Sequence, residues 1–315
     1  MSARTDGILR FGHNFSTYVR LDVEICKFLQ LCLMEFLIFD TIGHMKNQNR
    51  RHFLRRSSIG AAAIATSSAK IFANSVDSEK GFVDLFDGKT LKGWHKNPQR
   101  IGHGTGGVWK VEDGTITGEQ DPPGSGNGGI LLTDDKFGDF ELRLDIKPDW
   151  GVCSGLFLRG NDKGQCFQMM VDYHDAGNIG HIYGEGTGGF NTRPFDIDGK
   201  IQDGKLIGLK PKPKEEKPKI NYSISGEKFC ALYKVNDWNS VRVKCVGKHP
   251  KIETWINREK VCEFDAASYT GSGFDREKIA QTLGAKGSIA VQVHGGGGWP
   301  KGAKCRWRNI RIKEL

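Results

Sequence analysis

The chain has 315 residues and a formal net charge of +9, enough for one large domain or two small ones. Much of the excess charge lies in the first 73 residues, because residues 74–315 carry a net charge of only +4. The basic run at 210–219 contains three prolines and no aromatic residue, so it predicts a solvated loop and argues against a nucleic-acid partner.

The N-terminal region contains the parts of an export signal in the expected order. Residues 49–54 read Asn-Arg-Arg-His-Phe-Leu and resemble a twin-arginine motif. A weakly apolar stretch follows at 59–65, and Ile-Phe-Ala at 71–73 is typical of a small-residue cleavage site. We therefore expect residues 45–73 to be a signal peptide and the mature chain to be periplasmic or extracellular.

Residues 1–44 do not fit this signal, which should begin near a start codon. Met45 precedes the arginine pair by five residues, so we expect it to be the true start and residues 1–44 to be an over-extended N-terminus. The apolar stretch at 21–39 is interrupted by four charged residues, which disfavours a membrane span. No stable span is expected after the signal is removed.

Short strand patterns dominate residues 74–315, which we expect to form one domain. The patterns lie at 82–86, 108–111, 115–117, 129–132, 140–146, 241–245, 251–256, 260–264, 288–294 and 306–312. Asp113-Gly114 predicts a hairpin turn, and 275–283 predicts one short helix. An insertion at about 185–236 is rich in Gly, Pro and Lys and is weakly periodic. The pattern predicts a sandwich or jelly roll of antiparallel sheets.

Alternation along the strands separates an apolar face from a polar one. Strand 140–146 places Glu141 opposite its apolar residues, and Arg159 shares a face with Phe157. Other polar-face residues are Gln168, Asp172, His174, Gln292 and His294. These are either ordinary solvent-facing positions or the lining of a site. Four glycines and Trp299 follow His294, which favours a loop fitted around a ligand.

Six cysteines follow the signal, and none forms a Cys-x-x-Cys pair, so a zinc ribbon is not expected. They are Cys153, Cys166, Cys230, Cys245, Cys262 and Cys305. An exported protein can form disulfides, whereas folding before export would leave reduced thiols. The sequence leaves both outcomes open.

Seven motifs, in order, resemble the 3-keto-disaccharide hydrolase domain family. They lie at 85–94, 109–114, 138–142, 154–160, 182–184, 238–239 and 307–312. The resemblance covers residues 81–315 and implies a concanavalin A-like jelly-roll sandwich of two antiparallel sheets. The sequence departs from the family pattern at two positions and in one insertion. Gln168 stands where the family usually has Glu, Met170 stands where it usually has Gln, and the insertion containing 191–195 is not general to the family.

The resemblance also implies cleavage of glycosides that carry a ketone at C3. The ketone acidifies the C2 proton, so a base can remove it, the enolate can expel the group on C1, and water can then add. Such a site needs a base with a near-neutral pKa and a group that stabilises the enolate oxygen. The sequence specifies no cofactor. A divalent metal ion could stabilise the enolate oxygen in place of a side chain.

The first hypothesis is therefore a hydrolase that acts on an oligosaccharide or glycoside. Either His174 or His294 would be the base, and Asp172 would orient a histidine or bind a metal. Arg159 and Glu141 would hold sugar hydroxyls or the enolate. The expected substrate contacts are Gln168, His181, Arg193, Gln292 and Trp299.

Two other hypotheses remain. One is a non-catalytic carbohydrate-binding module of the cell envelope, with Trp94 or Trp299 as a stacking platform and Ca²⁺ held by carboxylates. The other is an envelope interaction protein, supported only by the Lys/Pro insertion. The chain has no nucleotide-binding glycine motif, so another protein must make the ketone. It also lacks the Gly-x-Ser-x-Gly and His-Glu-x-x-His motifs of serine hydrolases and zincins.

Overall fold

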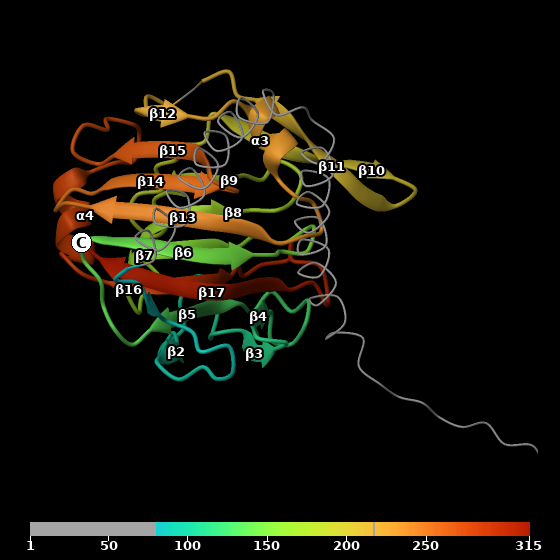
Figure 1. Cartoon of the computed structure of the whole chain (residues 1–315), viewed down its shortest axis with the longest axis horizontal. Helices are drawn as coiled ribbons and strands as arrows, with labels where there is room; N and C mark the ends of the chain where they lie inside the picture. The colour runs from blue at the N-terminus through green and yellow to red at the C-terminus, as the bar shows by residue number, and fades with distance from the viewer. Residues whose placement is uncertain (1–79, 217) are drawn as a thin grey trace, which may run out of the picture. The chain divides into compact units, whose positions relative to one another are not determined.

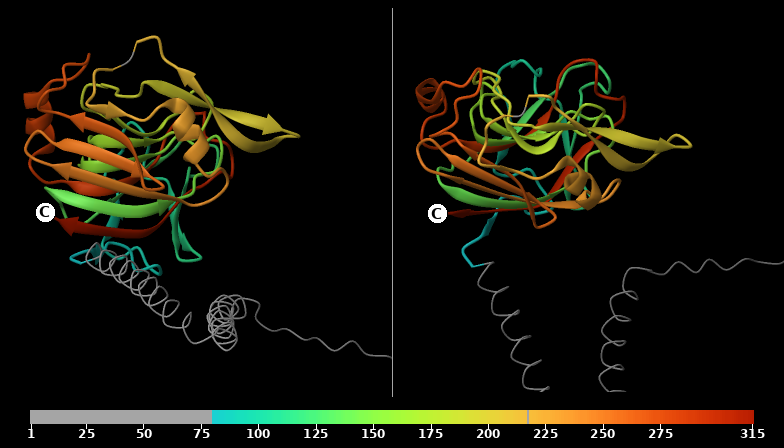
Figure 2. Two further views of the ribbon diagram at one scale, coloured as in Figure 1. Left: turned by 45° about the horizontal axis from the view of Figure 1, so that its top comes forward. Right: turned by 90° about the horizontal axis from the view of Figure 1, so that it is seen from above.

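The computed structural model describes residues 80–216 and 218–315. The expected signal at 45–73 and the segment 1–44 lie outside these residues. Two antiparallel sheets pack face to face, and the short helices lie at the periphery (Figures 1 and 2). The expected all-β sandwich is confirmed.

The larger sheet has nine strands, in the order β12-β15-β14-β13-β6-β17-β4-β3, with β1 paired to β17. Their bounds are β1 Val83–Asp84, β3 Val108–Glu112, β4 Thr115–Glu119, β6 Phe140–Ile146, β12 Tyr222–Ser223, β13 Asn239–Val246, β14 Lys251–Ile256, β15 Glu259–Asp265 and β17 Cys305–Glu314.

The smaller sheet has six strands, in the order β2-β5-β16-β7-β8-β9. Their bounds are β2 Trp94–Lys96, β5 Gly129–Thr133, β7 Gly155–Gly160, β8 Phe167–Val171, β9 Ile179–Tyr183 and β16 Ser288–Val293. Helix α4, Arg276–Leu283, lies where the sequence predicts a helix.

The core lies between the two sheets because their strands alternate as predicted. In β6, Phe140, Leu142, Leu144 and Ile146 are buried, and the residues between them face outward. Met169 of β8 and its odd-numbered neighbours face the same core. Each large apolar side chain buried in this way contributes about 1.5–3 kcal/mol.

Two hairpin turns follow directly from their residues. Asp113 and Gly114 have φ values of 49° and 71°, and Asn257 and Arg258 have φ values of 49° and 74°. Positive φ at both central residues is the type I′ turn that matches the twist of paired strands. The predicted hairpin β3–β4 is therefore confirmed, and β14–β15 is a second hairpin of the same kind.

The insertion has more structure than its weak periodicity predicts. Strands β10 (Phe195–Gln202) and β11 (Lys205–Pro213) form a separate two-stranded ribbon that projects from the sandwich (Figures 1 and 2). Helix α3, Gly226–Leu232, follows and is capped by Ser225.

The solvated loop predicted at 210–219 is partly wrong, since β11 contains its first four residues. These residues are nevertheless largely exposed, as expected of a solvated segment. The ribbon tolerates Pro211 and Pro213 because β11 pairs only with β10, so its other edge makes no ladder hydrogen bonds.

Neither helix in the part of the chain that the structure describes is long or apolar enough to cross a bilayer. The six cysteines among the described residues are free thiols.

Arg159 does not face outward with Phe157, because its φ of +52° turns the side chain out of the strand's alternation. The guanidinium is 1% exposed and donates hydrogen bonds to the carbonyl oxygens of Gly138 and Gly247, at 3.0 and 2.9 Å. It also donates to Asp139 Oδ1 at 2.9 Å. Arg159 ties β7 to the start of β6 and the end of β13, so the expectation that it contacts a sugar is corrected.

We expect Arg159→Ala to lower the free energy of unfolding by about 2–4 kcal/mol, since two buried carbonyl groups lose their donor. Urea unfolding of the purified chain measures this loss. Lys248→Ala, at an exposed side chain nearby, should change stability by less than about 0.5 kcal/mol. Equal effects of the two substitutions would contradict the structural role of Arg159.

Candidate functional site

Three strand ends of the smaller sheet meet at one edge and bring the predicted site residues together. β7 is antiparallel to both β8 and β16, so its beginning lies beside their ends. Cys153 precedes β7, Asp172 and His174 follow β8, and His294 follows β16. Alternation turns all four side chains away from the core, because Val152, Tyr173 and Val293 point into it.

Three of these residues, Cys153, His174 and His294, border a hollow of about 480 Å³, and Asp172 lies behind Cys153, whose thiol contacts its carboxylate. The lining of the hollow is Trp150, Gly151, Cys153, His174, Asp175, His294, Gly295, Gly298 and Trp299. The volume is that of a small-molecule site. Two of the four glycines after His294, Gly295 and Gly298, form part of the wall of the hollow.

Asp172 is held in an environment that favours its protonated form. Burial raises the pKa of Asp172 to about 6, opposed by a hydrogen bond from Cys153 and by the charges of His174 and Arg193. The Cys153 thiol donates to Asp172 Oδ1 at 3.2 Å. Burial and the Asp172 charge raise the pKa of Cys153 far above its usual value, so the thiol keeps its proton.

Both histidines have a nitrogen that can accept a proton. Nδ1 of His174 lies 2.7 Å from the carbonyl oxygen of Asp175, and Nδ1 of His294 lies 2.5 Å from that of Gly295. A carbonyl oxygen only accepts, so in the neutral form of each ring Nδ1 carries the hydrogen and Nε2 has the lone pair. Burial, with the nearby His103, lowers the pKa of His294. His294 is therefore neutral at pH 7 and can act as a base.

A hydrogen-bonded chain lies beneath the hollow. Gln168 Nε2 donates to Gln292 Oε1 at 3.0 Å, so Gln292 Nε2 donates in turn to His103 Nε2 at 2.9 Å. Gln168 and Gln292 are 3% and 0% exposed. The structure thus makes the two glutamines a support for the site rather than groups that reach a sugar. The ring of His103 lies 4.6 Å from that of His294, which fixes the position of His294 from below.

Of the two predicted residues near the insertion, only Arg193 lies close to the cluster. It donates to the carbonyl of Ala176 at 3.3 Å, pairs with Asp196 at 3.4 Å, and its charge lowers the pKa of Asp172. His181 is fully buried beside Phe195, with Nε2 2.9 Å from Ser223 Oγ. Burial lowers the pKa of His181 to about 3, so it is a neutral structural group.

Glu141 lies far from the hollow and from the other predicted site residues. It belongs to β6 of the larger sheet and points to that sheet's outer face, where it accepts hydrogen bonds from Arg143 and Arg242 at 2.9 Å each. The whole sandwich therefore separates Glu141 from the hollow, and its expected contact with the substrate there is corrected. Alternation predicted its outward direction, but not the sheet to which its strand belongs.

The tryptophans named as stacking platforms are mostly buried. Trp299 borders the hollow but is 4% exposed, and its Nε1 donates to the carbonyl of Ala303 at 2.8 Å. Trp94 is 8% exposed, and its Nε1 donates to the carbonyl of Leu85. Trp150, packed edge-on against Tyr173, is the more accessible indole in the hollow.

Sequence reasoning did not select Cys153, His103, Glu185 or Trp150. Cys153 could have been found, because it shares the outward face with Asp172 once β7 and β8 are paired. His103 lies in an irregular loop before β3, and Glu185, 3.4 Å from His103 Nε2, follows β9. No periodic pattern marks either residue.

Cys153, Asp172 and His174 could hold a metal ion. Their ligand atoms lie within 4.8 Å of one another. A thiolate, a carboxylate and an imidazole suit a borderline cation such as Zn²⁺ better than Mg²⁺ or Ca²⁺. A bound cation would supply a Lewis acid for a carbonyl oxygen.

The protein is thus an all-β sandwich with two histidines and a thiol beside a ligand-sized hollow at one edge of its smaller sheet. Residues 81–313 match the family model of the 3-keto-alpha-glucoside-1,2-lyase-like domain. The chain belongs to this family.

Individual known proteins match a shorter segment than the family model does, or match with low sequence identity. A 3-keto-disaccharide hydrolase of Bacteroides thetaiotaomicron is 38% identical over 88 residues, a segment that covers 26% of this chain and 28% of that protein. The match thus spans little more than a quarter of the curated relative.

Among solved structures, a proposed glycosyl hydrolase of Parabacteroides distasonis has 24% identity and a TM-score of 0.44, covering 74% of this chain and 99% of that one. The β-agarase B of Zobellia galactanivorans has 13% identity and a TM-score of 0.45, covering 74% and 92%.

We expect Asp172→Asn to stabilise the fold above about pH 6 and to have little effect near pH 4. The raised pKa means that the folded state binds the Asp172 proton more tightly than the unfolded state. The stability that this proton provides is complete below the ordinary carboxyl pKa and is lost as the pH rises through about 6. The gain at neutral pH is at most about 3 kcal/mol.

Urea unfolding at about pH 4 and about pH 7.5 tests this expectation. Asp175→Asn is the matched control, because the exposed Asp175 next to the hollow undergoes the same change of charge. A gain that is equal at both pH values, or equal in the control, would show that burial of the Asp172 charge is not its source.

Proposed function

We propose that this chain cleaves glycosides that carry a ketone at C3, and that the reaction takes place in the hollow beside Asp172, His174 and His294. The observation that carries this proposal is that His174 and His294 line one ligand-sized hollow, with the Asp172 carboxylate within 4.8 Å of His174, in a member of the 3-keto-alpha-glucoside-1,2-lyase-like family. Elimination across C1 and C2 needs a base, an acid and an electrostatic partner for an enolate, and the cluster offers all three.

His294 is the proposed base. Its Nε2 lone pair accepts the C2 proton, and the electron pair of the C2–H bond forms the enolate on the C3 oxygen. Burial keeps the imidazole neutral beforehand, and the hydrogen bond from Nδ1 to Gly295 holds the ring in the reactive tautomer. The guanidinium of Arg193 supplies positive charge at this side of the sheet.

Asp172 is the proposed acid. When the enolate collapses, the C1–O bond breaks and the departing oxygen takes a proton. A carboxyl group with a pKa of about 6 is partly protonated near neutral pH and can provide it, with His174 beside it to return the proton. Water then adds across the C1–C2 double bond, so elimination followed by hydration gives net hydrolysis.

Incubation of the purified chain with a 3-keto-disaccharide tests the activity directly, with products followed by mass spectrometry. Cleavage is expected, with the free monosaccharide released. Loss of cleavage with EDTA, and its return with added Zn²⁺, would assign the Cys153–Asp172–His174 group to a metal. Binding of several keto-sugars without any product would instead favour the carbohydrate-binding module.

We expect His294→Ala to lower kcat/KM by about 10²–10⁴-fold, because a general base contributes that much to proton abstraction. In the unsubstituted chain, kcat/KM should fall on the acid side as His294 becomes protonated, below the ordinary histidine pKa of 6.5. His249→Ala is the matched control, since His249 lies in the β13–β14 turn against Glu277. Unchanged turnover in His294→Ala would remove this residue from the mechanism.

A further inference from the structure

The lining of the hollow contains an indole that the proposed mechanism does not use. Trp150 is half-buried, whereas Trp299, the other indole of the lining, is 4% exposed and donates its Nε1–H to the carbonyl of Ala303. Within residues 80–216 and 218–315, no group accepts a hydrogen bond from Nε1 of Trp150, and this N–H is accessible to solvent. Trp150 therefore offers a ligand both an aromatic surface and a hydrogen-bond donor.

The projecting ribbon supports this indole. Gly199 of β10 lies so close to it that a Cβ added to the glycine would meet Cζ2 of Trp150 at 2.8 Å and Cε2 at 3.2 Å. The φ of Gly199 lies outside the left-handed region, so lack of space rather than backbone conformation requires glycine here. On the core side, the ring of Tyr173 lies 4.9 Å from that of Trp150. The indole is thus held in place between the ribbon, the core and the hollow.

Two hydrogen bonds attach the ribbon to the wall of the hollow. The N–H of Gly199 donates to Asp175 Oδ1 at 2.8 Å, and the N–H of Ala176 donates to Asp198 Oδ1 at 2.9 Å. Asp175 lines the hollow next to His174. The ribbon therefore positions both an aromatic and a polar group of the lining, which makes its base part of the site.

We propose that Trp150 is the platform for the leaving group, and that it thereby determines which glycosides are cleaved. The inference rests on the proposed cleavage of 3-keto-glycosides in this hollow. Because His294 must reach C2 of the keto-sugar, the group on C1 needs a support of its own, and a hollow of about 480 Å³ can hold a ligand of more than one ring. An indole presents a broad apolar face to such a ring. The leaving group is then a ring with an apolar face, either a second sugar or a phenol.

Steady-state kinetics of the full chain tests the platform with a 3-keto-disaccharide, a phenyl 3-keto-glucoside and a methyl 3-keto-glucoside. These substrates share the keto-sugar, and the group on C1 is a sugar ring, an aromatic ring or no ring. Trp150→Ala should raise KM about tenfold for at least one ring-bearing substrate, while KM for the methyl substrate and every kcat stay unchanged, because stacking on a group remote from C2 stabilises the bound substrate and the transition state equally. Trp150→Phe, which keeps an aromatic face, should retain most of the affinity.

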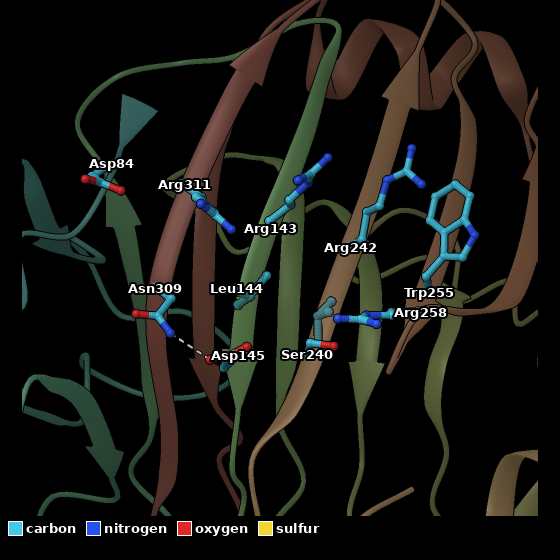
Figure 3. Close-up of a pocket in the computed structure, with 11 residues that line it drawn as sticks. Asp84, Arg143, Leu144, Asp145, Ser240, Arg242, Trp255, Arg258, Asn309 and Arg311 are labelled. Carbon is cyan, nitrogen blue, oxygen red and sulfur yellow. Dashed lines mark hydrogen bonds between the residues drawn. The ribbon is translucent and has the colours of Figure 1, made fainter. Parts of the chain in front are cut away.

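Gly199→Ala tests the support from the ribbon, because the added Cβ displaces the indole and should raise KM with the same dependence on the substrate. Gly208→Ala is its matched control, since Gly208 lies in β11 of the same ribbon and its Cβ would meet only the Lys200 side chain, at 3.5 Å. Trp255→Ala controls for the loss of an indole. Trp255 lies on β14 of the larger sheet, with the guanidinium of Arg242 4.2 Å from its ring (Figure 3). Neither control should change KM.

Two kinetic outcomes would overturn the proposal. One is an equal rise of KM for the methyl substrate, which would show a general distortion of the hollow. The other is an unchanged KM for both ring-bearing substrates. If Trp150→Ala fails to fold, as judged by its thermal unfolding, the comparison of Gly199→Ala with Gly208→Ala provides the test.

Failure of the proposed activity is a separate result, in which none of the three compounds is cleaved. Calorimetric titration of the same compounds then tests the platform alone. Tighter binding of a ring-bearing compound than of the methyl glucoside, with the difference lost in Trp150→Ala, would support it. Equal binding of all three compounds, or no binding of any, would contradict it.

Discussion

The antiparallel pairing of β7 with both β8 and β16 determines where the residues of the candidate site lie. Because neighbouring antiparallel strands begin and end at opposite edges, the start of β7 must lie beside the ends of its partners. Residues more than a hundred positions apart in the chain, such as Asp172 and His294, are thereby brought to one edge. The buried neighbours Val152, Tyr173 and Val293 point into the core, so the side chains next to them along the chain must point outward. The packing that stabilises the sandwich therefore also orients the side chains of the site.

The two outer faces of the sandwich use charge differently. Around the hollow, burial raises the pKa of Asp172 and lowers that of His294, so the two values move toward each other. On the larger sheet Arg143 and Arg242 keep a permanent charge, and register rather than burial sets their spacing. The buried carboxylate of Asp172 beside the hollow lowers the free energy of unfolding at neutral pH. The large apolar core between the sheets offsets that loss.

The strand pattern predicted the fold well because period-two alternation is a local property of each segment. It correctly placed the side chains of β6 and β8 on their inner and outer faces. It could not tell which sheet each strand joins, so Glu141 was grouped with residues on the other side of the molecule. Arg159 was misplaced for a different reason, since its positive φ breaks the alternation at that one residue. His103 and Glu185 come from loops, whose positions depend on the finished fold.

The six thiols of the described residues are poorly reactive because of where they lie. Burial raises the pKa of every one of them, from Cys153 at the hollow to Cys305 in the core, so the thiolate form that attacks disulfides and oxidants is scarce. None of the sheet pairings depends on a covalent cross-link. Oxidants that attack thiolates therefore find few targets among these six side chains, and the described strands are held together by packing and hydrogen bonds rather than by covalent links.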